Sequence, residues 1–239
     1  MRNGYIEPGD IMRAYWTDTH KELVMLNNTI DISHHQTLHS ATDIKGDGIQ
    51  FALLKATEGC DYTDPRYIAY RSALENAGIC CGAYHFGTGS DAAQQAVDFL
   101  NATKTLEAPS LLALDFESNP SGTTMTVPQA NTFVKTIYER TGRYPGLYVS
   151  TETIKKLRDW HQNATEHLYR CWLWVAQWGD EPNAAAISPW SHWTLWQYTD
   201  GGHGREPHAV SGIGTCDRDK FYGTEDQFQA FIKPRPNTP

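Results

Sequence analysis

The strongest constraint on the fold of this chain is the regular alternation of short apolar runs with amphipathic segments. An apolar run of about four to eight residues suits a buried parallel strand, and helical spacing of apolar residues suits the intervening segments. Repeated units of this kind predict a parallel β-sheet covered by helices. The predicted strands span residues 29–33, 51–56, 79–86, 110–117, 144–150, 172–177 and 193–198, with a last strand that ends at Asp217.

Predicted helices connect these strands mainly in the first half of the chain. They span residues 64–78, 91–103, 127–140 and 152–160, and a closing helix spans 224–232. Pro128 suits the first turn of its helix and Gly78 suits a helix end, because proline lacks an amide hydrogen and glycine tolerates a left-handed backbone. Few long helices fit between the last three strands. The pattern therefore predicts an α/β barrel of about eight strands that is irregular in its second half.

Length and composition favour one domain and exclude several partners. The 239 residues are 40% hydrophobic and show no compositional break that would mark a linker. A net charge of −8 argues against nucleic acid as a partner. No stretch reaches the ~18 apolar residues of a membrane-spanning helix, and residues 1–27 lack the apolar core of a secretory signal. If the chain is complete, we therefore expect synthesis in the cytosol and no integral membrane segment.

The five cysteines are an odd number without CxxC spacing, which does not suit a disulfide framework. Cys80 and Cys81 are neighbours in a predicted strand, so their side chains should face opposite sides of the sheet. Reduced thiols are expected, although a disulfide that involves Cys60, Cys171 or Cys216 stays open. Most of these cysteines lie in or before apolar strands, where unreactive thiols are usual.

Charged side chains gather where the predicted strands end. In a barrel of parallel strands these carboxyl ends open on one face, which is where active sites of this architecture lie. Randomly scattered acids would not sort to a single face in this way. The charged residues at these ends are Asp31, Lys55, Glu58, His85, Asp115, Glu117 and Asp217.

Asp115 and Glu117 offer the clearest chemistry among them. Two residues apart in a strand, they would point to the same side, with backbone positions roughly 6.5 Å apart. Two carboxylates in a low-dielectric pocket repel, so at least one pKa should rise, and a carboxylic acid that stays protonated can protonate a glycosidic oxygen. Acids at strand ends also cap helices and bind backbone amides, so the pair alone leaves a structural role open.

Other residues near this face suggest further interpretations. His34, His35 and His85 could form a metal site with Asp31, but adjacent histidines seldom converge on one ion and no His-x-x-x-His spacing occurs, so no metal is expected. Aromatic rings could form the walls of a saccharide groove, or could simply fill the core. The aromatic residues near the predicted open face are Tyr84, Tyr148, Trp178 and Tyr198.

Eight short motifs occur in order along the chain. They are DISHHQ (31–36), LLKATEG (53–59), GAYHF (82–86), LDFE (114–117), YVS (148–150), WVAQW (174–178), WQY (196–198) and CDR (216–218). This series resembles glycoside hydrolase family 25, the lysozymes of the Chalaropsis type. One such motif would be unspecific, whereas eight in sequence over nearly the whole chain are highly specific. Thr37 departs from the usual Pro, Gly or Glu of the first motif, at a loop position.

The resemblance implies a flattened, irregular (β/α) TIM-like barrel as the catalytic domain, over residues 29–232. Residues 1–28 would be an N-terminal extension of unknown role, and residues 233–239 a Pro-rich C-terminal tail. The implied activity is that of an N-acetylmuramidase, which cleaves the β-1,4 bond between N-acetylmuramic acid and N-acetylglucosamine in peptidoglycan. No cofactor is implied. The partners would be the glycan strands of peptidoglycan, and the protein would act as a monomer.

The resemblance also implies roles for individual residues. Glu117 would be the general acid/base. Asp115 would either orient the 2-acetamido group of the substrate or act as the nucleophile, and Asp31 and Asp217 would complete an acidic floor. The residues that would bind substrate are Tyr84, Tyr148, Trp178, Gln197, Lys55 and Glu58.

Two other functions stay open from the sequence. One is a non-catalytic cell-wall-binding module. The other is a chitinase-like hydrolase, although Ser110 and Ala113 stand where chitinases carry earlier aspartates of a longer acidic run. The biological setting would be that of a phage endolysin or a non-classically delivered enzyme, or of a secreted enzyme if the chain is truncated.

Overall fold

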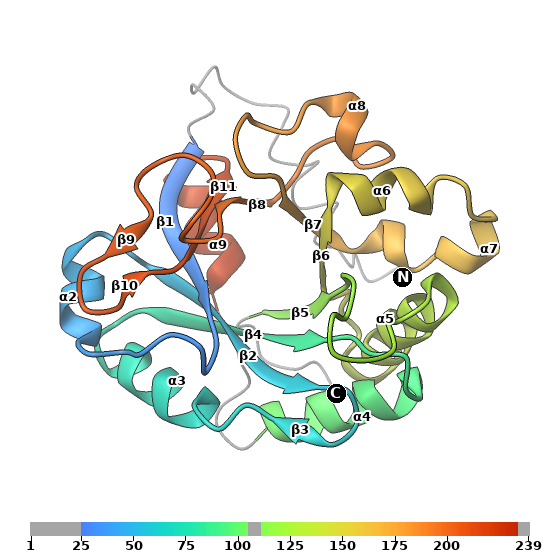
Figure 1. The fold of residues 1–239 in the computed structure, drawn as a ribbon, viewed down its shortest axis with the longest axis horizontal. Coiled ribbons are helices and arrows are strands. Elements are labelled where there is room, and N and C mark those ends of the chain that lie inside the picture. The colour runs from blue at the N-terminus through green and yellow to red at the C-terminus, as the bar shows by residue number, and fades with distance from the viewer. Residues whose placement is uncertain (1–24, 105–110, 234–239) are drawn as a thin grey trace, which may run out of the picture.

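A closed barrel forms the centre of the computed structural model, which describes residues 25–104 and 111–233 (Figure 1). Within these ranges, eight strands pair in the order β1-β11-β8-β7-β6-β5-β4-β2, and β1 pairs with β2 to close the ring. The barrel strands are β1 (Met25–Ile32), β2 (Phe51–Glu58), β4 (Cys80–Phe86), β5 (Leu112–Asp115), β6 (Gly146–Ser150), β7 (Trp172–Ala176), β8 (Leu195–Thr199) and β11 (Asp217–Tyr222). The predicted α/β barrel of about eight strands is confirmed.

The direction of the last strand differs from the prediction. All neighbouring pairs of barrel strands from β1 through β8 are parallel, whereas β11 is antiparallel to both β1 and β8. The predicted strand that ends at Asp217 was wrong, because β11 begins at Asp217. An antiparallel strand places its first residue beside the last residues of its neighbours. Asp217 therefore still lies at the carboxyl-end face, opposite Asp31 of β1.

The ends of several elements also differ. β1 begins at Met25, four residues before the predicted start, so the barrel begins inside the predicted extension 1–28, of which residues 1–24 lie outside the described ranges. The helix predicted from residue 64 begins at Tyr67, because Asp64 instead binds the backbone amides of His34 and Arg66. Most of the predicted tail, residues 234–239, also lies outside the described ranges.

Helices cover the outside of the barrel, and the long ones lie in the first half of the chain as predicted (Figure 1). Thr126 and Gln129 form a reciprocal capping box at the start of α5, and Gly142 ends that helix in the left-handed conformation. No helix in the described ranges is long and apolar enough to span a membrane. The helices are α2 (Ala41–Gly46), α3 (Tyr67–Asn76), α4 (Ala92–Thr103), α5 (Val127–Thr141), α6 (Thr151–Leu157), α7 (Gln162–Thr165), α8 (Ala184–Ile187) and α9 (Glu225–Ile232).

Four short elements complete the described structure. β3 (Tyr62–Thr63) folds back antiparallel on the end of β2. β9 (Ala209–Val210) and β10 (Gly214–Thr215) form a separate two-stranded ribbon. The 3₁₀ turn η1 (Leu168–Arg170) leads into β7.

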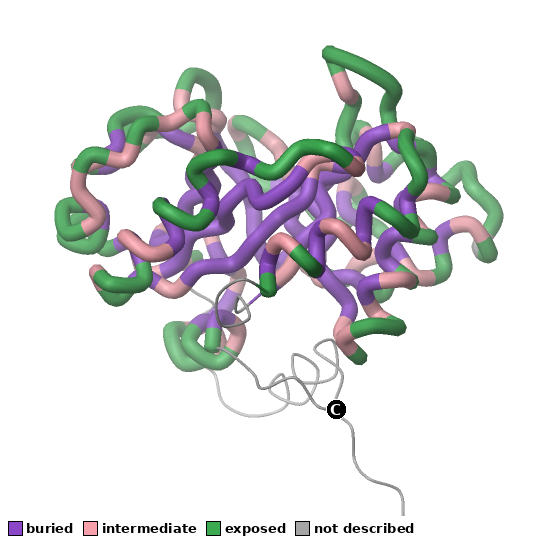
Figure 2. The backbone as a smooth tube through the Cα atoms, turned by 90° about the horizontal axis from the view of Figure 1, so that it is seen from below, coloured by how far each residue is buried: buried purple, intermediate pink, exposed green. Residues whose placement is uncertain are grey.

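Side chains point alternately to the two sides of each strand, and this divides the core into two layers. One set of side chains packs between the sheet and the outer helices, and the other fills the barrel. In the inner set, Phe228 and Ile232 of α9 pack with Phe221, so α9 closes the end of the barrel remote from Asp217. Figure 2 shows that buried residues concentrate along the central strands. One end of the barrel interior is thus apolar, and polar side chains are confined to the other.

Gly146 makes room for the Trp172 ring, since an added Cβ would lie 2.3 Å from ring atom Cζ2. We expect Gly146→Ala to lower the free energy of unfolding by about 1–3 kcal/mol through overpacking. Gly46→Ala is the matched control, because no atom lies within 4 Å of its added Cβ, and its effect should stay within about 1 kcal/mol. Urea denaturation measures both, and equal effects of the two substitutions would contradict this packing.

Candidate active site

The four acids predicted from the sequence lie together at the carboxyl-end face of the barrel. Asp31 of β1 is paired in register with Asp217 of β11, and Asp115 is the last residue of β5. Asp31, Asp115 and Asp217 each have their pKa raised partly by the charge of at least one other acid of this group. The antiparallel direction of β11 is what places Asp217 within this group.

Glu117 lies beyond the strand in which it was predicted. β5 ends at Asp115, and Glu117 lies in the bend that follows. The backbone amide of Phe116 still donates to the carbonyl of Tyr148 at 2.9 Å, which extends the pairing with β6 by one residue. Glu117 is therefore held at the mouth of the barrel, whereas Asp115 lies inside it.

Burial sets different environments for these two carboxyl groups. Burial, and then the charge of Glu117, raise the pKa of Asp115 well above its ordinary value, and Lys55 opposes the rise. One carboxyl oxygen of Asp115, Oδ1, is buried without a hydrogen-bond partner. The Glu117 side chain reaches solvent, yet nearby protein atoms desolvate its carboxyl group and raise its pKa as well. At least one of the two groups is thus favoured as a neutral acid.

Gln197 connects the acids to the aromatic wall. Its amide Nε2 donates to Oδ2 of Asp31 at 2.9 Å and to Oδ2 of Asp217 at 3.2 Å. Its Oε1 accepts from the Tyr148 hydroxyl at 2.8 Å and from Nε1 of Trp178 at 3.3 Å. Because both ends of the amide are engaged, its orientation is fixed. Gln197 was predicted to bind substrate, and the structure makes it the centre of a hydrogen-bond network.

The predicted aromatic residues divide between the two faces of the sheet. Tyr84 and Tyr148 face the interior and pack edge-on against Trp174, with ring centroids 5.9 and 4.7 Å away. Trp178 is 49% exposed at the rim and stacks on His203. Tyr198 was predicted near the open face, but it packs in the outer layer. Adjacent residues of a strand point to opposite sides, so the inward Gln197 forces Tyr198 outward.

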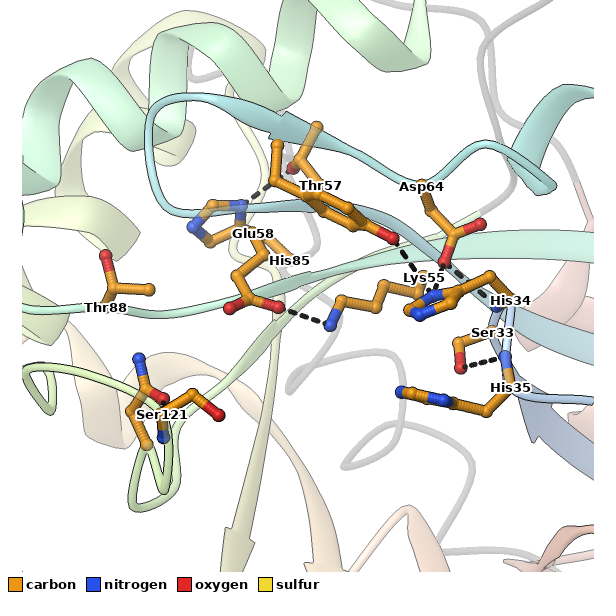
Figure 3. Close-up of polar contacts among 12 residues, drawn as sticks. Ser33, His34, His35, Lys55, Thr57, Glu58, Asp64, His85, Thr88 and Ser121 are labelled. Carbon is orange, nitrogen blue, oxygen red and sulfur yellow. Dashed lines mark hydrogen bonds and ion pairs between the residues drawn. The ribbon is translucent and has the colours of Figure 1, made fainter.

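Lys55 and Glu58 form an ion pair on the opposite wall, with Lys55 Nζ 2.6 Å from Glu58 Oε2 (Figure 3). The ammonium group lies over the rings of Phe86 and Tyr62, at 4.9 and 5.7 Å from their centroids. Because Lys55 opposes the pKa rise of both Asp115 and Glu117, it is the cation that acts on the catalytic candidates. The chain thus supplies both signs of charge at this face.

The histidines near this face are engaged elsewhere. His34 binds Asp64 through Nδ1 at 2.9 Å (Figure 3). His85, predicted at a strand end of the site, is fully buried on the outer side, where Thr57 and Gln95 bind its ring and burial lowers its pKa to about 4. Adjacent residues of a strand point to opposite sides of the sheet, so the inward position of Tyr84 turns His85 outward. Among the described residues no group of His, Cys, Asp and Glu could hold a metal ion.

The cysteines do not supply a nucleophile. All five are free thiols. Burial raises the pKa of Cys81, Cys171 and Cys216, which keeps these thiols protonated and unreactive. Cys81 lies in the outer layer while Cys80 packs against the inner cluster, so the two neighbours face opposite sides as predicted.

The sequence reasoning missed Asp219, a fifth acid in the barrel. It is fully buried and accepts a hydrogen bond from Nε1 of Trp174 at 2.6 Å. Burial raises the pKa of Asp219 to about 7. The spacing Asp217-Arg218-Asp219 is the signal that could have revealed it, because residues two apart in a strand share a face. Because the predicted strand ended at Asp217, Asp219 was not considered to be part of it.

Glycoside hydrolases use a pair of carboxyl groups of the kind that this barrel holds at its carboxyl-end face. The chain matches the family model "Glycosyl hydrolases family 25" over residues 30–206 and belongs to that family. It is 32% identical to lysozyme M1 of Streptomyces globisporus, over 82% of this chain and 67% of that protein. The predicted family resemblance is confirmed, and with it the assignment as a muramidase-type glycoside hydrolase.

Solved structures agree with this assignment. The bacterial lysozyme from Streptomyces coelicolor has a TM-score of 0.69 and 29% identity, with 85% of this chain and 95% of that chain covered. The family GH25 lysozyme from Aspergillus fumigatus has a TM-score of 0.67 and 28% identity, with 88% of this chain and 100% of that chain covered. The barrel described above is therefore the fold of this family.

The buried acids predict how stability depends on pH. Burial raises the pKa of Asp217 to about 6 and of Asp219 to about 7, so the folded protein keeps protons that the unfolded chain releases from about pH 4 upward. Each group should therefore lower the free energy of unfolding by up to about 1.4 kcal/mol per pH unit until its folded pKa is reached. His85 acts in the opposite sense below about pH 6.5, because its folded pKa is depressed.

We expect the net stability to fall between about pH 4 and pH 7, since in the described part of the chain the five acids with a raised pKa outweigh the four histidines with a lowered pKa, of which only His85 is almost fully buried. Asp219→Asn should make this fall shallower, and the exposed control Asp159→Asn should leave it unchanged. Urea denaturation across this range measures the slope. A slope that is the same in Asp219→Asn as in the wild type would show that Asp219 does not hold its proton.

Proposed function

We propose that the chain hydrolyses the β-1,4 bond between N-acetylmuramic acid and N-acetylglucosamine of peptidoglycan, with Glu117 as the general acid/base. The observation that carries this proposal is the juxtaposition of Glu117 at the mouth of the barrel with a buried, unpartnered oxygen of Asp115. Glycosidases use such a carboxyl pair to protonate the leaving oxygen and to stabilise positive charge at the sugar.

Glu117 suits the role of proton donor. Its carboxyl group combines access to solvent with a raised pKa. Access allows a glycosidic oxygen to approach, and the raised pKa keeps the proton available nearer to neutral pH. After bond cleavage the same group, now ionised, would take a proton from the attacking water, so one residue serves as acid and then as base.

Asp115 would act on the sugar itself. Its buried Oδ1 lacks a donor, and an unsatisfied buried acceptor costs about 1–3 kcal/mol. The N–H of a 2-acetamido group would supply this missing donor and would orient the acetamide for attack on the anomeric carbon. Direct attack by Asp115 is the alternative. Retention of configuration is expected in both mechanisms.

The surrounding residues would bind and orient the glycan strand. The 49% exposed ring of Trp178 provides a platform for a sugar face, and its hydrogen bond to Gln197 fixes that platform relative to the acids. Tyr84 and Tyr148 would form the inner wall, and Lys55 with Glu58 would form the opposite wall. The partner is thus the glycan strand of the bacterial cell wall.

Glu117→Gln removes the transferable proton while keeping the size of the side chain. We expect the rate of lysis of purified peptidoglycan to fall by about 10²- to 10⁴-fold, with no change in folding. Glu152→Gln on the exposed face of α6 is the control and should lyse at the wild-type rate. Lysis by Glu117→Gln at the wild-type rate would refute the assignment.

Mass spectrometry of the released muropeptides tests the bond that is cut. New reducing ends on muramic acid identify a muramidase, whereas reducing glucosamine ends, cut peptides or no release identify a glucosaminidase, an amidase or a binding module. Chitin as a parallel substrate tests the chitinase-like alternative, and we expect no cleavage of it.

Asp115→Asn distinguishes a catalytic from a structural Asp115. We expect it to lose most activity, because an amide can neither attack the sugar nor stabilise a cationic acetamide-derived ring. Intact-protein mass spectrometry of rapidly quenched wild-type enzyme then separates the two mechanisms. A glycosyl adduct on Asp115 would identify a nucleophile, and its absence during turnover would favour the acetamide route. Activity near the wild-type level would leave Asp115 only a structural role.

A further inference from the structure

Asp219 lies one layer below the acids that face the mouth of the barrel. It stands two residues after Asp217 on β11, is paired in register with Thr29 and Gln197, and has 0% exposure. A substrate at the mouth cannot reach a fully buried side chain. Any effect of Asp219 on the reaction must therefore pass through other residues.

One oxygen of Asp219 is held by the aromatic wall. The indole N–H of Trp174 donates to Oδ1 at 2.6 Å, and the Trp174 ring packs edge-on against both Tyr84 and Tyr148. A hydrogen bond to a charged or partly charged acceptor in a dry interior is strong and directional. Asp219 thereby fixes the ring on which the two inner tyrosines rest.

The other oxygen of Asp219 has no ordinary donor. Oδ2 is buried, and within the described residues no amide, hydroxyl or ring N–H donates to it. The carboxyl group of Asp31 is, however, within hydrogen-bonding reach of Asp219, and it also reaches Asp217. Two carboxyl groups can form a hydrogen bond only when one of them is protonated. The register of β1 and β11 brings Asp31 beside Asp217, and the buried Oδ2 of Asp219 has no other donor among the described residues, so a proton shared between Asp31 and Asp219 would satisfy this oxygen.

The charges around Asp219 also favour protonation of one carboxyl group in this cluster. The charged and titratable groups that act on Asp219 are Asp31 of β1 and Asp217 and Arg218 of β11. Arg218 is the one cation among them, and its guanidinium points outward to the carbonyl of Ala209 and to Asn27. Three ionised carboxylates beside one outward-facing cation would be costly in a water-free interior.

We propose that Asp219 is a positioning residue that shares a proton with Asp31 and so limits the negative charge that Asp31 itself presents to Asp115. This inference rests on the proposed function, because it assigns Asp219 a part in the same reaction. Asp31 is the link, since Asp115 and Asp31 interact electrostatically across the site. With the Asp31–Asp219 pair carrying one proton, Asp115 can ionise, as both of its alternative roles require.

The substitution Asp219→Asn should shift the pH dependence of kcat in a defined direction. The charge of Asp219 raises the pKa of Asp31, so its removal should lower that pKa. Asp31 is then ionised at lower pH, and its negative charge makes the ionisation of Asp115 harder. The acidic limb of the kcat profile should therefore move to higher pH, with kcat at about pH 5 reduced on the order of tenfold. KM should change little, because Asp219 does not touch substrate.

Carbon-13 NMR of aspartate carboxyl groups tests the shared proton without activity. In the wild-type protein without substrate, Asp219 should titrate near pH 7, and in Asp219→Asn the Asp31 signal should titrate at lower pH than in the wild type. Trp174→Phe is a second variant that keeps the carboxyl group but removes its N–H donor, so the Asp219 titration should move upward. Asp159→Asn, on the surface, is the control and should change neither titration.

The outcomes separate this inference from the proposed function. If the wild-type enzyme releases no muropeptides with reducing muramic acid, the proposed function fails whatever the titrations give. If the wild-type enzyme is active but Asp219 titrates like an exposed aspartate, or Asp219→Asn keeps the wild-type kcat profile, the inference on Asp219 is overturned. A shifted acidic limb together with a lowered Asp31 titration supports it.

Discussion

Desolvation of carboxyl groups at one end of a closed barrel is the constraint on which the rest of this structure depends. Asp31, Asp115 and Asp219 are buried there, and each must find a donor, a shared proton or a ligand. The fold supplies donors from the far wall, through Gln197 and Trp174. The stability that offsets this polar end comes from the apolar packing in the rest of the barrel and beneath the helices.

The two ends of the barrel illustrate how stability and function are separated in one fold. The lower interior is closed by α9 and filled by large apolar side chains, in agreement with local sequence preferences. The upper interior violates those preferences, with a row of acids and a buried lysine. Such violations concentrate at functional sites, where an unsatisfied group such as Asp115 Oδ1 is available for a ligand.

Particular residues show how far sequence reasoning reached. The positions of Asp31 and Asp115 at one face followed from apolar periodicity and from the rule for the ends of barrel strands. Asp217 reaches the same face because the antiparallel strand β11 begins there. The outward turn of His85 and Tyr198 was missed because the prediction considered only their nearness to strand ends, whereas adjacent residues of a strand face opposite sides. Asp219 was missed because apolar periodicity does not report strand direction, so β11 was thought to end where it begins.

The sequence by itself determined the strand–helix order, the family and the acids that can carry chemistry, because these depend on local periodicity and on short motifs. The tertiary structure alone decided which side chains meet. Hydrogen bonds from Gln197 to Asp31 and Asp217 join residues 166 and 20 positions apart, and Trp174 reaches Asp219 across 45 positions. Such pairings arise from barrel closure and from the antiparallel entry of β11, and no local pattern encodes them.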